Sequence, residues 1–233
     1  MRQVVLLVAL LLSCGGGKAN RGKGVQRSSE AVTVPTLAPN SYMKLDTKDP
    51  SRQHTWSMRG QQCQPCQDEI AASWGTVRSS SELEGYPPQN IRLPLRLDQA
   101  WCEGVDGPGL GEWIEYRFTT PIQLAYLEVS PGFTKTRAAM FENNQVKRVT
   151  MVLDGQEAAI IRFPRMTEAQ GVFTVLGSED WWEGATLAPR EVDERIAATP
   201  FKTIRFVIDE VYRGTKHNDT CISALSPALF EPL

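Results

Sequence analysis

Short segments in the middle and near the end of the chain alternate apolar and polar residues. In the segment 113–118, Ile114, Tyr116 and Phe118 alternate with charged residues, and this period of two is typical of a half-buried β-strand. The segment 204–208 shows the same period and predicts a late strand. An apolar run at 124–129, which follows Pro121, predicts a further strand, separated from the first by the proline.

A hairpin is predicted next to these strands. Val149, Met151 and Leu153 share one face of a strand that closes at Asp154-Gly155, a dipeptide favoured in tight hairpin turns, and the apolar run 159–163 supplies the returning strand. Short strands separated by Gly, Pro and Asn turns favour an all-β fold, a β-sandwich or jelly roll. The segment 191–197 could add one or two helical turns between flanking prolines.

The N-terminus has the pattern of an export signal. Arg2 precedes an unbroken apolar run, Val4 to Leu12, which is far shorter than the roughly 20 residues that cross a bilayer. The run ends in Leu11-Leu12-Ser13-Cys14, which resembles the bacterial lipobox. We therefore expect a lipoprotein signal peptide at 1–13 and lipidation of Cys14, with an ordinary secretory signal as the alternative. A lipid-anchored protein of the cell envelope, at the outer membrane or cell surface, would result.

Residues 14–62 are predicted to be a flexible tether. Three consecutive glycines follow Cys14, and scattered prolines and basic residues interrupt any periodicity. The remainder, 63–233, is then the folded domain. The whole chain has 233 residues, 41% of them hydrophobic, and a net charge of −2, so no basic surface points to a nucleic-acid partner.

Four further cysteines remain in this exported chain: Cys63, Cys66, Cys102 and Cys221. An even number predicts two disulfides, with three connectivities open. The C-x-x-C spacing of Cys63 and Cys66 also fits a redox motif, or a zinc site completed by a histidine. No βαβ pattern surrounds the pair, and structural bridges are the favoured interpretation.

The most distinctive stretch is the loop from Asp98 to Trp113. It holds four glycines and a proline, and the tryptophans Trp101 and Trp113 lie near its two ends. A loop that carries aromatic rings and carboxylates and runs directly into a strand favours a binding module over an enzyme. We expect Trp113 to be a core residue, whereas core and surface positions are equally open for Trp101. Trp181-Trp182 is a second, more exposed-looking aromatic pair.

Three stretches carry a family resemblance: 97–114, with Trp-Cys-Glu-Gly; 132–147, with Glu-Asn-Asn-Gln; and 211–223, with Gly-Thr-Lys-His-Asn-Asp-Thr. Over about 79–227 they resemble the discoidin-like module found as the translocation domain of bacterial NAD glycohydrolases. The resemblance implies a galactose-binding-like jelly roll and an accessory, non-catalytic role. Ala224 stands where the family commonly has a glutamate, so a structural calcium is in doubt, and no other cofactor is expected.

The resemblance also implies a site. Its first and third motifs should meet at one end of the sandwich, which favours a Cys102–Cys221 bridge. We expect Trp101, Glu103, Tyr212 and Asn218 to face a shared groove there and to bind a neutral polar ligand, a glycan or an envelope partner.

Two alternatives stay open. Glu103, Asp106 and Glu112 could supply the carboxylate pair of a carbohydrate hydrolase, although solvated loop acids are commoner. The module could also serve envelope assembly alone. Asn143, Asn144 and Asp219 are expected to satisfy backbone donors in turns, and His217 to be a loop residue without a catalytic role.

Overall fold

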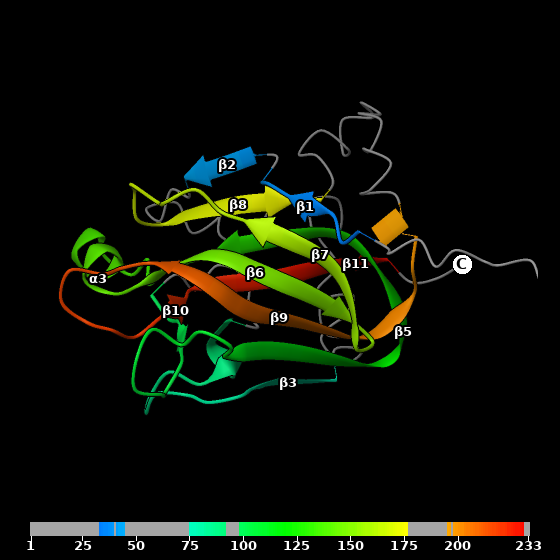
Figure 1. The fold of residues 1–233 in the computed structure, drawn as a ribbon, viewed down its shortest axis with the longest axis horizontal. Coiled ribbons are helices and arrows are strands. Elements are labelled where there is room, and N and C mark those ends of the chain that lie inside the picture. The colour runs from blue at the N-terminus through cyan, green and yellow to red at the C-terminus, as the bar shows by residue number, and fades with distance from the viewer. Residues whose placement is uncertain are drawn as a thin grey trace, which may run out of the picture. The chain divides into compact units, whose positions relative to one another are not determined.

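The computed structural model describes residues 33–39, 41–44, 75–91, 98–176, 195–196 and 198–230, and all the strands below belong to the compact unit Val34–Leu233. These strands form two layers (Figure 1). The first layer has the order β1 (Thr36–Leu37), β7 (Gln156–Arg162), β6 (Gln145–Leu153), β9 (Phe201–Tyr212), β5 (Trp113–Ser130) and β3 (Thr76–Ser79). The second has the order β2 (Ser41–Lys44), β8 (Gly171–Val175), β5 and β11 (Ala224–Phe230).

Short elements gather at one end of these layers. They are the 3-10 turn η1 (Pro88–Ile91), the paired strands β4 (Trp101–Cys102) and β10 (Cys221–Ile222), and the six-residue helix α3 (Arg137–Glu142). The predicted all-β sandwich is thereby confirmed. No helix in the described part of the chain has the length and apolar character needed to cross a membrane.

The long strand β5 belongs to both layers. Its first part pairs with β3 and β9, and its last part pairs with β8 and β11. The prediction of two strands separated by Pro121 is wrong, because β5 runs through the proline. Its register with β9 shifts between Arg117 and Ile122, and a proline, which has no N–H to donate, is tolerated where the ladder is interrupted.

The hydrophobic core lies between the layers, and the alternating patterns point into it as predicted. Ile114, Tyr116 and Phe118 are at most 4% exposed, and Ile204, Phe206 and Ile208 are at most 2% exposed. The hydroxyl of Tyr116 donates a 2.5 Å hydrogen bond to the Leu225 carbonyl, which links the two layers. Burial of each such side chain contributes about 1.5–3 kcal/mol to folding.

The predicted hairpin is also confirmed. Asp154 and Gly155 join β6 to β7 with φ values of 45° and 83°, the two positive φ angles that a type I′ turn requires. The Asp154 carboxylate accepts hydrogen bonds from the N–H groups of Lys202 and Thr203, so the turn also holds the start of β9.

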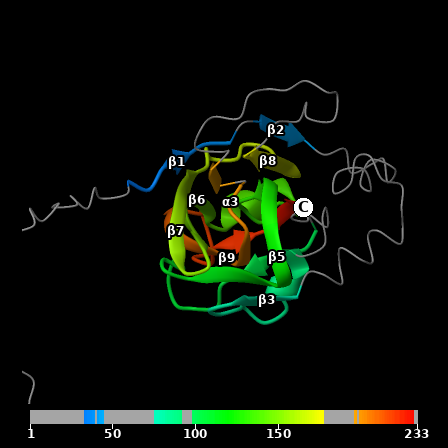
Figure 2. The same ribbon diagram turned by 90° about the vertical axis from the view of Figure 1, so that its right-hand side faces the viewer.

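The predicted tether is wrong for residues 34–44. This segment adds β1 parallel to β7 in the first layer and β2 antiparallel to β8 in the second (Figure 2). Leu37 is 8% exposed and belongs to the core, and the Pro35 carbonyl accepts the Ile160 N–H at 2.8 Å. The signal peptide, Cys14, the rest of the predicted tether and nearly all of the predicted 191–197 helix lie outside the described residues.

Candidate functional site

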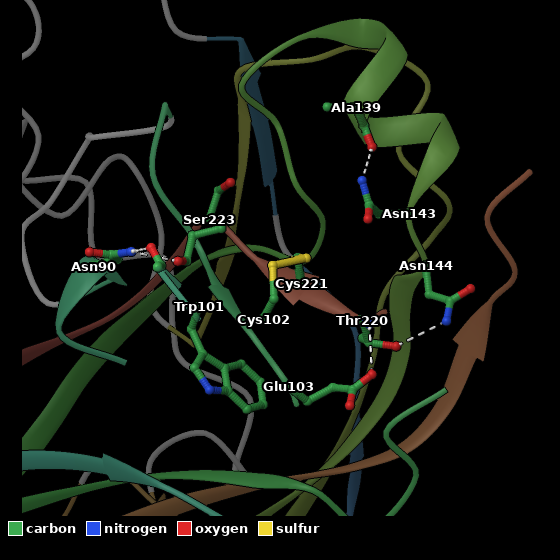
Figure 3. Close-up of a disulfide and its surroundings, with 12 residues drawn as sticks. Asn90, Trp101, Cys102, Glu103, Ala139, Asn143, Asn144, Thr220, Cys221 and Ser223 are labelled. Carbon is green, nitrogen blue, oxygen red and sulfur yellow. Dashed lines mark hydrogen bonds between the residues drawn. A yellow bond between two sulfur atoms is a disulfide. The ribbon is translucent and has the colours of Figure 1, made fainter. Parts of the chain in front are cut away.

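A disulfide joins the first and third sequence motifs at the end of the sandwich where β4 and β10 pair (Figure 3). Cys102 and Cys221 face each other in the antiparallel register, their sulfurs are 2.05 Å apart, and both residues are buried. The expected pairing and the expected contact between the two loops are confirmed. Cys63 and Cys66 lie outside the described residues, so the second bridge stays a prediction.

Glu103 holds these loops together from the inside. Its carboxylate accepts hydrogen bonds from the Thr220 N–H at 3.0 Å and the Val105 N–H at 2.9 Å. Gly109 packs on its side chain with φ of 65°, and a Cβ there would lie 2.5 Å from the Glu103 Cγ. Burial of the carboxyl raises its pKa and outweighs the two hydrogen bonds, which act in the opposite direction.

The expected exposure of Glu103 and Trp101 in a groove is therefore wrong, since both residues are 0% exposed. The Trp101 ring lies in the core, and its Nε1 donates to the Ser81 carbonyl at 3.0 Å. The expectation that Trp113 is a core residue is also wrong, because Trp113 is only half-buried, and of the two positions left open for Trp101 the structure shows the core one. A Gly-rich loop suggests surface positions for both Trp101 and Glu103, but here the side chains of these two residues point into the interior.

The third motif wraps around the end of α3. The Asn144 side chain accepts the Gly214 N–H at 2.8 Å and donates to the Asn218 carbonyl and to the Thr220 hydroxyl. The N–H groups of Lys216 and His217 donate to the Glu142 carbonyl. A Cβ at Gly214 would come within 2.4 Å of that same carbonyl oxygen, so the motif's glycine permits the close approach.

Two predicted ligand contacts remain accessible. Tyr212 is half-buried and donates its hydroxyl to the Phe163 carbonyl at 3.1 Å, while Asn218 is exposed and its amide oxygen accepts from Arg213. Their role in ligand binding stays a prediction. His217 is exposed and lies 3.9 Å from the Glu142 carboxylate. Trp181 and Trp182 lie outside the described residues.

Exposed aliphatic side chains mark the outer surface of this end. Leu83 is 36% exposed, Val105 39% and Leu110 55%, and these are the exposed large hydrophobic residues of the described ranges. The Leu83 N–H donates to the Cys102 carbonyl and the Val105 N–H to Glu103, so the locked loops carry them. We call Leu83, Val105 and Leu110 the aliphatic tip. The sequence analysis missed these residues, and the two apolar residues within the Gly-rich loop are the signal that could have found them.

The calcium question has a partial answer. Within the ranges that the structure describes, no group of three or more His, Cys, Asp and Glu residues could hold a metal ion. Ala224, at the position where the family commonly has a glutamate, is 5% exposed and opens β11.

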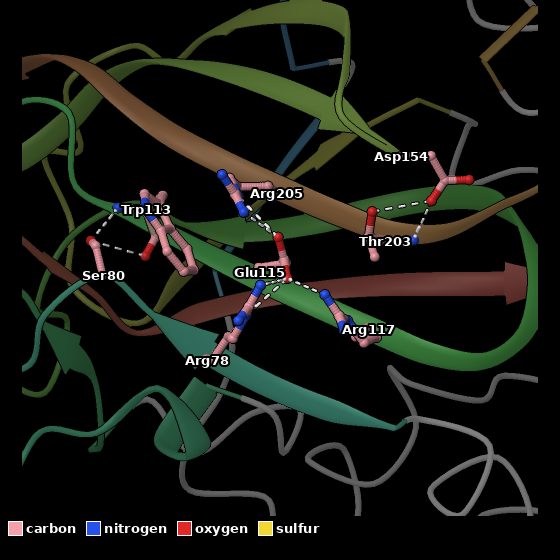
Figure 4. A network of polar contacts seen from close by, with 8 residues as sticks. All are labelled: Arg78, Ser80, Trp113, Glu115, Arg117, Asp154, Thr203 and Arg205. Atoms are coloured by element: carbon pink, nitrogen blue, oxygen red, sulfur yellow. Dashed lines mark hydrogen bonds and ion pairs between the residues drawn. The ribbon is translucent and has the colours of Figure 1, made fainter.

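A second polar site lies on the outer face of the first layer (Figure 4). The Glu115 carboxylate, whose side chain is 5% exposed, accepts from Arg205 at 2.6 Å and 3.0 Å on one oxygen and pairs with Arg78 at 2.7 Å on the other. Arg117 is 3.7 Å away. The Trp113 ring lies 4.3 Å from the Arg205 guanidinium and 5.5 Å from that of Arg78.

Glu115 is charged in this setting. Burial of the carboxyl is the largest single influence on its pKa and raises it, but the hydrogen bonds and charges of Arg205 and Arg78 together outweigh burial. The pKa of Glu115 therefore lies below its ordinary value. The alternation of 113–118 placed Glu115 and Arg117 on the solvent side, but only the cross-strand register brings Arg78 and Arg205 to Glu115.

The chain is a two-layer β-sandwich with its loop end closed by a disulfide, which agrees with the discoidin-like module that the sequence motifs resemble. The family model that matches residues 68–226 is described as the NAD glycohydrolase translocation F5/8 type C domain, and the chain belongs to this family. The resemblance carried by the three sequence motifs is confirmed, and the match begins before the expected residue 79. That description names a translocation domain and not the glycohydrolase itself.

Solved structures with similar folds are distant. The CBM32-1 and CBM32-2 domains of Clostridium perfringens ZmpB align with 10% identity and a TM-score of 0.44, covering 88% of this chain and 43% of that one. This chain thus spans less than half of that structure's length. The family 32 CBM of C. perfringens NanJ, in complex with galactose, has 12% identity and a TM-score of 0.41, covering 66% and 93%. No curated protein matches the chain.

Proposed function

We propose that this chain is the non-catalytic binding module of a membrane-anchored bacterial lipoprotein, and that it recognises a glycan or a protein partner of the cell envelope through its disulfide end. The observation that carries this proposal is the aliphatic tip, Leu83, Val105 and Leu110, presented on loops that are locked from within. When a partner covers apolar groups that face solvent on a fixed scaffold, their removal from water contributes favourably to the free energy of binding.

The locked loops favour binding for a second reason. A loop that is already ordered loses little conformational entropy when it meets a ligand. The Cys102–Cys221 bridge, the buried Glu103 and the close packing of Gly109 all order the 98–112 loop before any contact is made.

The hydrolase alternative has less support from the same geometry. A glycosidase needs two carboxyl groups whose oxygens can reach the substrate. Backbone N–H groups occupy both oxygens of Glu103 in the interior, and the Ser80 and Ser81 hydroxyls both donate to Glu112. These carboxylates hold loops together, which leaves them poorly placed for glycoside hydrolysis.

The lipid anchor is part of the proposal and rests on the Leu11-Leu12-Ser13-Cys14 sequence. Acyl chains on Cys14 would hold the module at a membrane surface in the cell envelope. A stable anchor and a rigid binding end together suit a protein that captures its partner close to that surface.

The test is a glycan array and an array of purified envelope proteins, both probed with the chain lacking residues 1–14. Val105→Ser/Leu110→Ser should lose the binding that the wild type shows, because it removes the exposed aliphatic groups. Val152→Ser, at the hairpin end of β6, is the control and should bind normally. Absence of binding on both arrays would favour a purely structural role, and turnover of chromogenic glycosides would favour the hydrolase.

A further inference from the structure

The outer face of the first layer carries two groups of cations. The first comprises Arg78, Arg117 and Arg205 around Glu115. The second comprises Lys147, Arg148 and Arg162 around Asp209 and Glu210. The register places Arg205 beside Glu115, and Arg148 beside Arg162, on strands whose other side chains point into the core. We call these six cations and the strip between them the arginine face.

The arginine face has an excess of positive charge on a protein whose net charge is −2. Its six cations contact three carboxylates, which leaves an excess of three. Glu157, opposite Val152 near the hairpin, lowers this excess to two. Glu112 is not part of this charge balance, because it lies beyond the end of the strands and accepts hydrogen bonds from the Ser80 and Ser81 hydroxyls.

The geometry leaves guanidinium groups available to a ligand. Arg117 and Arg162 each approach a carboxylate only at 3.7 Å, and their side chains are 58% and 49% exposed. A guanidinium has five N–H donors, and Arg78 and Arg205 each direct Nε and one terminal nitrogen at Glu115. Cations held near one another repel, and an anion that bridges them relieves that repulsion.

An uncharged row separates the two groups. Trp113, Val207, Thr150 and Ile160 are register partners on successive strands, and each is half-buried. The row therefore offers the aliphatic groups of Val207 and Ile160, flanked by guanidinium groups on both sides, and it ends at the Trp113 ring, which the Arg205 guanidinium covers at 4.3 Å. Apolar contact along the row and charged contacts at its edges suit a chain molecule with apolar ring faces and regularly placed anionic groups.

We propose that the arginine face binds an acidic polysaccharide. Sugar rings would lie along the row from Val207 to Ile160, and their carboxylates would pair with Arg117 on one side and Arg162 on the other. This site is separate from the aliphatic tip and does not rest on the function proposed for that end.

The test uses polygalacturonate as the probe and measures its binding to the chain lacking residues 1–14. Fully methyl-esterified polygalacturonate, which has the same backbone without the charges, is the ligand control. Arg117→Gln and Arg162→Gln should each weaken binding by up to about fivefold, and the double variant by more than either alone. Binding should also fall as salt is added, because exposed charge pairs are screened.

Matched variants distinguish the arginine face from general electrostatic attraction and from the aliphatic tip. Lys135→Gln/Lys216→Gln removes two exposed cations from the loop end and should bind polygalacturonate as the wild type does. Arg117→Lys/Arg162→Lys keeps the charge without the planar fork and should lose less than the double glutamine variant. Val105→Ser/Leu110→Ser, which alters only the tip, should bind polygalacturonate normally.

Three results would overturn the proposal. They are equal binding of the esterified polymer, unchanged binding by a folded Arg117→Gln/Arg162→Gln variant, or an equal loss in the lysine control. The variants are expected to fold, because the contacts that they remove are long and lie on exposed side chains.

Discussion

Removal of the Cys102–Cys221 bridge should strongly destabilise the domain. The bridge closes a loop with a sequence separation of 119. In the chain-entropy model, cross-linking ends this far apart lowers the entropy of the unfolded chain enough to stabilise the fold by about 5 kcal/mol. Measured losses for native bridges are about 2–5 kcal/mol, so the loss in Cys102→Ala/Cys221→Ala should lie in this range.

Thermal and urea unfolding provide the assays. A loss of this size in the free energy of unfolding should lower the thermal midpoint by about 10 °C, and it should also lower the midpoint urea concentration. The denaturant slope should rise, because the unfolded chain without the cross-link exposes more surface. An unchanged midpoint would refute the reasoning. A loss without any change of slope would assign the effect to packing around the sulfurs rather than to the unfolded chain.

Further predictions follow from burial and charge. Trp101→Ala should cost about 3–5 kcal/mol in thermal or urea unfolding, and Trp113→Ala clearly less, because only the first ring is fully buried; equal losses would contradict this assignment. Leu37→Ala should lower the free energy of unfolding by about 2–5 kcal/mol, and an unchanged midpoint would mean that Leu37 belongs to a flexible tether and not to the core. The pKa of Glu115 is lowered in the folded state, so its ion pairs contribute fully to the free energy of unfolding above the ordinary pKa of 4.5. This contribution is lost as the pH falls through the folded-state pKa. The free energy of unfolding of Glu115→Gln should therefore fall less steeply with acid than that of the wild type. Cys14→Ala should move the mature protein from the membrane fraction to the soluble fraction, and mass spectrometry showing an unlipidated wild-type N-terminus would contradict lipidation.

Local sequence patterns determined the strands and their faces. Alternation in 113–118 and 204–208 predicted which side chains enter the core, because successive side chains of a strand point to opposite faces. Asp154-Gly155 predicted its own turn, because few residue pairs tolerate two positive φ angles. The family motifs also led correctly to the Cys102–Cys221 pair.

Long-range contacts decided what local patterns left open. The fate of each tryptophan depends on what the 98–112 loop packs against: Trp101 meets Ser81 in the core, while Trp113 lies beneath arginines from other strands. The strands Thr36–Leu37 and Ser41–Lys44 have no strong strand pattern of their own, and they form by pairing with the edges of β7 and β8.

The same division holds for the candidate sites. The sequence alone established that a Gly-rich loop and a charged strand existed, since both are properties of neighbouring residues. Only the tertiary structure turned Glu103 inward to bind Thr220, and only the register of β3, β5 and β9 brought Arg78 and Arg205 to Glu115. Contacts between residues that are 37 to 117 positions apart depend on the packing of the whole sandwich, which no local pattern encodes.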